Sequence, residues 1–259
     1  MRFLVRIVKK SVMQSIGAAC LFVLTLTLAK PALARSATHP EPSETRSGED
    51  RNDTNPKTVT ILGLGDSITQ GSTDFDSYLF PLQKKLRQAG YHFRLIGPKA
   101  SVHQPDSIYN AGYGGKTAEF LATMVDSIYT RFPADVVLLH SGHNHFDTEN
   151  PVAGIIAAQK SMIAKLIAIN PRVVILVAQV ITSGKLPKYS YIPALNQQIG
   201  EMVNQLNNRQ VILVNQAKGW EWEKNTIADK VHPNARGAEK MAQAWFKALK
   251  RHWPSTDRN

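Results

Sequence analysis

Apolar and polar residues alternate along the chain in blocks that predict strands followed by helices. Short continuous apolar runs are typical of strands covered on both faces, while longer blocks repeat their apolar positions at helical spacing. The predicted strands span Val59–Leu64, His92–Ile96, Ala134–His140, Arg172–Ile181 and Gln210–Val214. The predicted helices span Tyr78–Ala89, Ala118–Tyr129, Val152–Ile169, Tyr191–Leu206 and Ala235–Arg251. Because strands and helices alternate, the sequence predicts one α/β domain, a three-layer α/β/α sandwich around a mostly parallel sheet.

The first 34 residues have the pattern of a signal peptide. A basic start precedes an apolar run from Ser11 to Ala29 and then Ala32-Leu33-Ala34, a small-x-small cleavage pattern. We therefore expect cleavage after Ala34 and a secreted or periplasmic mature protein, without stable membrane association. An uncleaved anchor stays open as the alternative, because the apolar run is about long enough to span a bilayer. A lipoprotein signal is not expected, since Gly17 stands where that signal has leucine.

Composition divides the residues after the predicted signal peptide into a tether, a folded domain and a tail. Residues 35–57 are polar and rich in Ser, Thr, Pro and charged groups, which predicts a disordered tether before a folded domain at 58–253 and a disordered tail at 254–259. Cleavage would lower the formal charge from +11 to +6, because five basic residues and no acidic ones leave. No basic patch interleaved with aromatics is present, so nucleic acid is not an expected partner. Cleavage would also remove Cys20, the one cysteine, which excludes disulfides and cysteine nucleophiles from the mature chain.

The stretch from Gly65 to Gly71, Gly-Asp-Ser-Ile-Thr-Gln-Gly, follows the first predicted strand directly. It places Ser67 on a turn built from residues that tolerate unusual backbone angles. A serine hydroxyl becomes a nucleophile when a base removes its proton and an anion site receives the developing charge. Backbone N–H groups at a helix start supply part of such a site. The stretch is also compatible with an ordinary Gly-rich connection, so the rest of the chain must decide.

Asp229-Lys230-Val231-His232-Pro233 supplies the groups that Ser67 needs. A general base for serine requires an imidazole whose far nitrogen is held by a carboxylate. A separation of three residues on one turn lets Asp229 reach His232 Nδ1. Pro233 and Asn234 are suited to begin the last predicted helix, which would hold the pair on a rigid element.

Two further stretches are candidates for the anion site. Asn144 follows the strand that ends at His140, and its side-chain N–H groups can stabilise an oxyanion. Gly115, in Gly114-Gly115, offers a backbone N–H without side-chain obstruction. Three histidines in this region, His140, His143 and His145, also suggest a possible metal site. We expect them to point in different directions, and no helical His-Glu-x-x-His pattern is present, so neither a metal nor another cofactor is expected.

Together these stretches resemble the SGNH, or GDSL, hydrolase superfamily, whose blocks are Gly-Asp-Ser, a glycine, Gly-x-Asn-Asp and Asp-x-x-His in that order. The resemblance spans the predicted domain and implies a flavodoxin-like α/β/α fold. It implies that Ser67 is the nucleophile, His232 the base and Asp229 its partner. It also implies an oxyanion hole made of the Ser67 N–H, the Gly115 N–H and the Asn144 side chain. One residue departs from the pattern: His145 stands where the family usually has aspartate.

Within the superfamily, the chain is similar to carbohydrate esterases that include acetylxylan esterases. This similarity rests on two stretches, Asn110-Ala111-Gly112-Tyr113-Gly114-Gly115-Lys116-Thr117 and Val177-Ala178-Gln179-Val180-Ile181. We expect an exported serine esterase that removes small acyl groups, above all acetyl, from carbohydrate or another small ester. The alternatives are a lipid-directed esterase, thioesterase or lysophospholipase of the same fold, and a carbohydrate-binding relative without activity.

Four other residues are candidate substrate contacts. Asp66 and His143 belong to the blocks around the nucleophile and the oxyanion donor. Trp220 and Trp222 precede Asp229 closely, and exposed aromatic rings there would stack on a sugar. Core packing is the alternative use of both tryptophans, and the sequence favours it.

Overall fold

The computed structural model describes residues 58–103 and 105–254, which form a three-layer α/β/α domain. Its seven-stranded sheet has the order β3-β4-β1-β5-β6-β7, and β2 (Phe93–Ile96) also pairs with β1 (Val59–Gly65). β1 lies parallel to β5 (Val136–His140), which is followed outward by β6 (Val174–Gln179) and β7 (Val211–Asn215). These strands are apolar on both faces, as the continuous apolar runs predict. The predicted fold class is confirmed.

One edge of the sheet differs from the prediction. β3 (Lys99–His103) and β4 (Asp106–Gly112) form an antiparallel hairpin, and β4 pairs in parallel with the end of β1. The sequence does not predict these strands because most of their residues are polar or exposed. An edge hairpin can place polar side chains in solvent, so it lacks the apolar run of a central strand.

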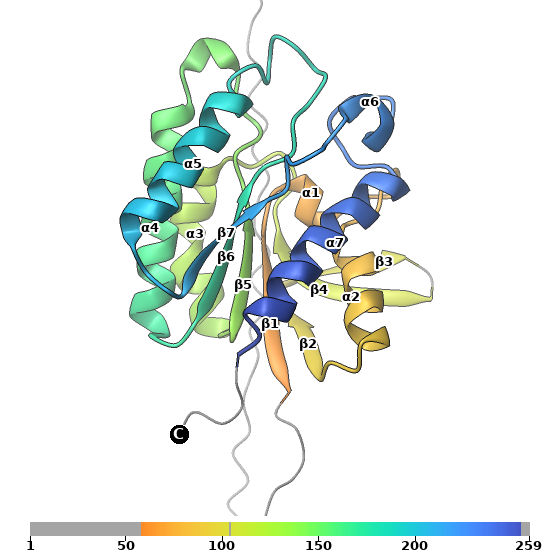
Figure 1. Cartoon of the computed structure of the whole chain (residues 1–259), viewed down its shortest axis with the longest axis vertical. Helices are drawn as coiled ribbons and strands as arrows, with labels where there is room; N and C mark the ends of the chain where they lie inside the picture. The colour runs from red at the N-terminus through yellow and green to blue at the C-terminus, as the bar shows by residue number, and fades with distance from the viewer. Residues whose placement is uncertain (1–57, 104, 255–259) are drawn as a thin grey trace, which may run out of the picture. The chain divides into compact units, whose positions relative to one another are not determined.

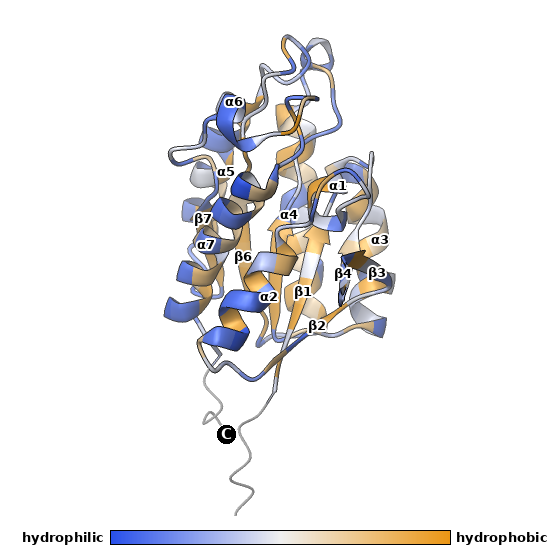
Figure 2. Cartoon of the chain, turned by 90° about the vertical axis from the view of Figure 1, so that its right-hand side faces the viewer, coloured by the Kyte–Doolittle hydropathy of each residue, from blue (hydrophilic) through white to orange (hydrophobic). Residues whose placement is uncertain are grey.

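Helices cover both faces of the sheet. Figure 1 shows α3 (Ala118–Arg131), α4 (Val152–Ile169) and α5 (Ile192–Leu206) side by side on one face, and α2 (Leu79–Gln88) and α7 (Ala235–Arg251) on the other. The bounds of α4 and α7 match their predictions residue for residue. In Figure 2 the strands are mainly orange between helices with blue outer surfaces, so apolar side chains gather in the interior. α7 contributes a buried face of Ala238, Met241, Ala242, Trp245 and Leu249.

Among the described residues, α4 is the one helix long and apolar enough to cross a membrane. It lies between α3 and α5 in one helical layer (Figure 1), and Ile155, Met162 and Leu166 are fully buried. A buried helix of an α/β sandwich has the same length and composition, so these features do not indicate a membrane span.

The parallel strands all end at the same end of the sheet, and the candidate site residues lie in the loops that follow these carboxyl ends. Three short helices follow these strand ends: α1 (Ser67–Gln70) after β1, the 3₁₀ helix η1 (Asp147–Glu149) after β5, and α6 (Trp222–Asn225) after β7. The predicted signal peptide at 1–34 and tether at 35–57 lie outside the described residues, as does all but Pro254 of the predicted tail.

Candidate active site

The turn after β1 presents Ser67 at the first position of α1. Asp66 is the N-cap, and its Oδ1 accepts a hydrogen bond of 2.9 Å from the Ile68 N–H. Gly65 is required just before it, because a Cβ there would lie 2.3 Å from the His140 carbonyl oxygen. The cap and the close approach of β1 to β5 therefore fix the direction in which Ser67 leaves the sheet.

His232 reaches Ser67 from the loop that precedes α7. The Ser67 hydroxyl donates to His232 Nε2 over 2.8 Å. His232 Nδ1 is hydrogen-bonded to Asp229 Oδ2. Because a carboxylate only accepts, this bond places the proton on Nδ1 and leaves Nε2 free to receive the serine proton. The structure thus brings together the serine, histidine and aspartate that the sequence selects.

Backbone hydrogen bonds preorganise the carboxylate of Asp229. Its Oδ1 accepts from the N–H groups of Val231 (2.9 Å) and His232 (3.0 Å). Partial burial acts to raise the pKa of Asp229, but the hydrogen bonds from the His232 ring and these two amides hold that pKa below its ordinary value. Lys230 has a φ of 63°, and its carbonyl accepts from the Ser183 hydroxyl, which ties this turn to the loop after β6. Asp229 is therefore held as a charged partner for the imidazole.

Phe75, which is not among the residues that the sequence suggests for the site, packs directly on the imidazole of His232. The two rings are stacked with centroids 4.1 Å apart and planes 18° from parallel. Phe75 belongs to the loop between α1 and α2, which is closed on itself by a hydrogen bond from the Ser72 N–H to the Phe75 carbonyl. No sequence pattern links Phe75 to His232, because 157 positions of chain separate them and only the fold joins the two loops.

The candidate oxyanion donors Gly115 and Asn144 line the same cavity as Ser67. Gly115 has a φ of 71°, and its N–H has no hydrogen-bond partner among the described residues. Asn144 has a φ of 72°, in the left-handed region that asparagine tolerates better than most residues. One hydrogen of its amide goes to the Lys116 carbonyl at 3.0 Å, which leaves the second for a ligand. Gln70 supports the glycine loop by accepting from the Gly114 N–H at 2.7 Å.

His145 occupies the position where the resemblance leads one to expect aspartate, and it is held by two carboxylates. Its Nε2 lies 2.9 Å from Glu119 Oε2 on α3, and its Nδ1 lies 2.9 Å from Glu149 Oε2 in η1. The histidine thereby connects the loop that carries Asn144 to two neighbouring elements. Each ring nitrogen of His145 thus faces a carboxylate, and this clamp of Glu119, His145 and Glu149 stands where the family pattern has a single aspartate.

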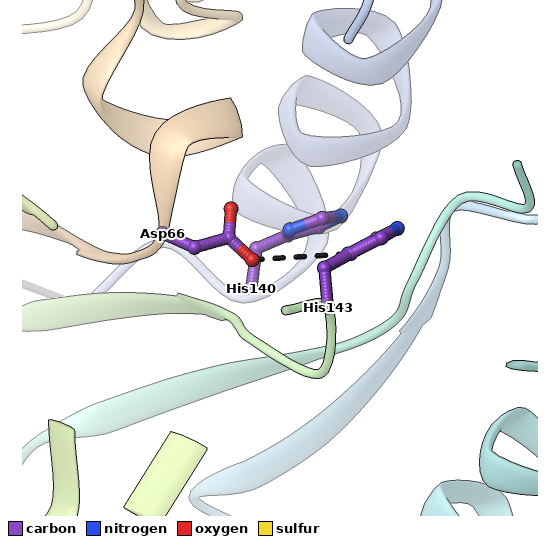
Figure 3. A group of neighbouring side chains, drawn as sticks. All are labelled: Asp66, His140 and His143. Atoms are coloured by element: carbon purple, nitrogen blue, oxygen red, sulfur yellow. Dashed lines mark ion pairs between the residues drawn. The ribbon is translucent and has the colours of Figure 1, made fainter. Parts of the chain in front are cut away.

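Asp66, which precedes Ser67, forms a buried polar cluster with His140 and His143 (Figure 3). The rings of His140 and His143 stack with centroids 5.9 Å apart, so the expectation that the histidines point in different directions is wrong for this pair. It holds for His145, which points to Glu119 and Glu149. Burial lowers the pKa of His140 to about 3 and that of His143 to about 4, and it raises the pKa of Asp66 to about 7. Both imidazoles are therefore neutral at pH 7.

All of the catalytic candidates border one open cavity of about 500 Å³. Ser67, Gly115, Asn144, Asp229 and His232 line it, and so does His143. Asp66 is only 1% exposed and lies beneath the cavity rather than in its wall. None of the remaining residues of the wall is a candidate site residue from the sequence; these are Ile68, Gln70, Gly71, Ser72, Asp74, Phe75, Gly114, Lys185, Tyr189, Ile227 and Val231.

Neither candidate tryptophan lines this cavity. Trp220 is 8% exposed and donates its indole N–H to the Thr182 carbonyl at 2.9 Å. Trp222 packs against Gly184, and the Lys230 ammonium lies 5.7 Å from its ring centroid. Both side chains thus pack against the loops around the Asp229 turn. This agrees with core packing and not with stacking on a sugar, the two uses that the sequence left open.

Known proteins resemble this chain in sequence and in fold. Residues 64–240 match the model of the GDSL-like lipase/acylhydrolase family. A multidomain esterase of Ruminococcus flavefaciens is 27% identical over 240 residues, covering 77% of this chain but only 29% of its own length. A carbohydrate esterase of family 3 from Talaromyces cellulolyticus has a TM-score of 0.67 at 22% identity, over 75% of this chain and 97% of the other. A mutant acetyl esterase solved with an acetate ion has a TM-score of 0.66 at 21% identity, over 75% and 97%.

Proposed function

Because the chain belongs to the GDSL-like lipase/acylhydrolase family, whose members act on ester bonds, we propose that it is a serine esterase that removes acetyl and other small acyl groups from carbohydrate. The observation that carries the proposal is the continuous hydrogen-bonded chain from Ser67 through His232 to Asp229 at the wall of a cavity. The neighbours described as carbohydrate and acetyl esterases support the choice of substrate.

The reaction follows from the positions of these groups. Ser67 Oγ attacks the ester carbonyl carbon while its proton passes to His232 Nε2. Asp229 stabilises the imidazolium that forms. The carbonyl oxygen becomes an oxyanion, which the Ser67 and Gly115 N–H groups and the free amide hydrogen of Asn144 stabilise. His232 then protonates the departing sugar oxygen, leaving an acyl group on Ser67.

Hydrolysis of this acyl-enzyme uses the same groups in reverse. Water enters the open cavity and gives a proton to His232 Nε2 as its oxygen attacks the acyl carbon. Collapse of the second tetrahedral intermediate returns that proton to Ser67 Oγ and releases the carboxylic acid. Every proton is transferred by a described side chain, so the proposed mechanism uses no cofactor.

The rim of the cavity suits a hydroxyl-rich leaving group. Ser72, Asp74 and Lys185 supply hydrogen-bonding groups along it, and Phe75 and Tyr189 supply aromatic rings. The apolar side chains of Ile68, Ile227 and Val231 also line the cavity, and they can contact a short acyl group. The polar groups favour a sugar as the leaving group, and the assay below decides the length of the acyl chain.

The test is hydrolysis of p-nitrophenyl esters and of acetylated xylan by purified enzyme. Acetyl should exceed octanoyl in kcat/KM, and acetate should be released from the polysaccharide. A Ser67→Ala protein, matched in preparation, controls for contaminating esterases. A higher kcat/KM for octanoyl would replace the carbohydrate assignment by a lipid-directed one, and equal rates for wild type and Ser67→Ala would refute the serine mechanism.

We also propose that the enzyme acts outside the cytoplasm without stable attachment to a membrane. The support is the sequence pattern of residues 1–34, with its basic start, apolar run and small-x-small end. The mature N-terminus of protein made in its native secretion route should be Arg35 by mass spectrometry. An intact N-terminus in a membrane fraction would show an uncleaved anchor instead.

A further inference from the structure

The cluster of Asp66, His140 and His143 contains polar atoms that the rest of the described structure leaves unpaired. The three side chains are at most 2% exposed. Asp66 Oδ2, both ring nitrogens of His140 and His143 Nδ1 are buried without a hydrogen-bond partner among the described residues. An unpaired buried polar group is costly, and here the three residues that carry these atoms are neighbours (Figure 3).

The hydrogen bond on the far side of His143 decides which atom faces Asp66. His143 Nε2 lies 3.2 Å from the Ile181 carbonyl oxygen, which can only accept. Nε2 therefore carries the proton, and Nδ1 presents a lone pair. Asp66 Oδ2 lies 3.7 Å from that lone pair, too far for a hydrogen bond. Two acceptors that face each other in a buried place require a cation or a proton between them.

The spacing fits a metal ion. One ligand atom from each of the three residues lies within 4.8 Å of the other two. A tetrahedral zinc ion with bonds of about 2.0–2.2 Å holds its ligand atoms roughly 3.3–3.6 Å apart, so shifts on the order of an ångström would close the site. Two imidazoles and a carboxylate are ligands that zinc accepts, and a ligating histidine usually donates its other N–H to a carbonyl, as His143 does.

We propose that Asp66, His140 and His143 form a zinc-binding site that is separate from the ester chemistry. The ion would connect the nucleophile turn after β1 to the loop after β5 that carries Asn144 (Figure 3). Asp66 Oδ1 remains on the Ile68 N–H while Oδ2 turns to the metal, so the cap of α1 is retained. Entry is through the active-site cavity, because His143 forms part of its wall. The bound ion is a structural clip and not a catalyst.

Zinc binding to EDTA-stripped protein tests this directly, without reference to activity. We expect one high-affinity zinc per chain by metal analysis after dialysis, and a rise in Tm with added zinc, since an ion that binds only the folded state stabilises it. His143→Gln and Asp66→Asn should each weaken zinc binding at least tenfold. Asp66→Asn keeps an oxygen for the Ile68 N–H, so it tests the site even where His143→Gln does not fold.

Two matched controls remove other histidines that sit beside carboxylates. His145→Gln eliminates the clamp with Glu119 and Glu149, and His232→Gln eliminates the pair with Asp229; both should bind zinc as the wild type does. No zinc binding by the wild type would overturn the proposal and would assign the space between Asp66 and His143 to a proton. Binding that survives Asp66→Asn but is lost in either control would place the ion elsewhere and would overturn it equally.

Discussion

Asn144 is the residue whose replacement tests the oxyanion site most directly. One of the two hydrogens on its amide is donated to the Lys116 carbonyl at 3.0 Å, and the proposed mechanism assigns the other to the reacting oxygen. Asn144→Ala therefore removes a single oxyanion donor. A donor of this kind is worth about 10²–10³ in kcat, or roughly 3–4 kcal/mol. The loss should appear in kcat more than in KM, because the interaction strengthens as negative charge develops.

The backbone of Asn144 requires a second variant. Its φ of 72° is unfavourable for alanine by about 1–2 kcal/mol, so Asn144→Ala also destabilises the loop. Asn144→Gly removes the same amide but accepts this φ without strain. Both variants should lose kcat by the same two to three orders of magnitude, while only alanine lowers Tm appreciably.

Steady-state kinetics on p-nitrophenyl acetate, with thermal unfolding of each protein, provide the measurement. If Asn144→Gly kept a near-normal kcat, the oxyanion would be held by other groups and the role of Asn144 would be limited to loop structure. Substitution by aspartate offers a further comparison, because it keeps the shape of the side chain and removes both donors.

Four more outcomes are expected. Ser67→Ala and His232→Ala should each lower kcat by about four orders of magnitude or more with the fold intact, and Asp229→Asn by less, because catalytic residues act as a unit; single-turnover and steady-state rates measure this. His145→Ala should lower kcat less than Asn144→Ala does, since His145 acts only through the loop; a KM effect alone would contradict that role. Activity measured in EDTA, at a temperature where the stripped protein stays folded, should equal that of untreated enzyme; a loss under those conditions that zinc restores would contradict a purely structural role for the ion. The pKa of Asp229 is lower in the folded protein than in the unfolded chain. Its ionised carboxylate therefore stabilises the fold above the unfolded-state pKa, and this stabilisation is lost as pH falls through the folded-state pKa. The free energy of unfolding of Asp229→Asn should accordingly depend less on pH than that of the wild type below about pH 4.

The sequence by itself determined the central layers and the catalytic blocks. Continuous apolar runs such as Val136–His140 can only be satisfied by burial on both faces, so they identify central strands without knowledge of their neighbours. The bounds of α7 follow from its apolar face and its Asn234 cap, which are local features. Asp229 and His232 lie on one turn, so their pairing is also local.

Tertiary structure alone decided the contacts between distant segments. β3 and β4 were not predicted because an edge hairpin is stabilised by pairing with β1 and not by its own hydrophobicity. Phe75 stacks on His232, and His143 turns toward His140 and Asp66, because the parallel strands bring separate loops to one edge of the sheet. Side-chain direction at a strand end depends on the backbone after it, which no periodic pattern specifies. The alternation of apolar and polar residues thus sets the layers, while packing at the carboxyl edge of the sheet sets which side chains meet.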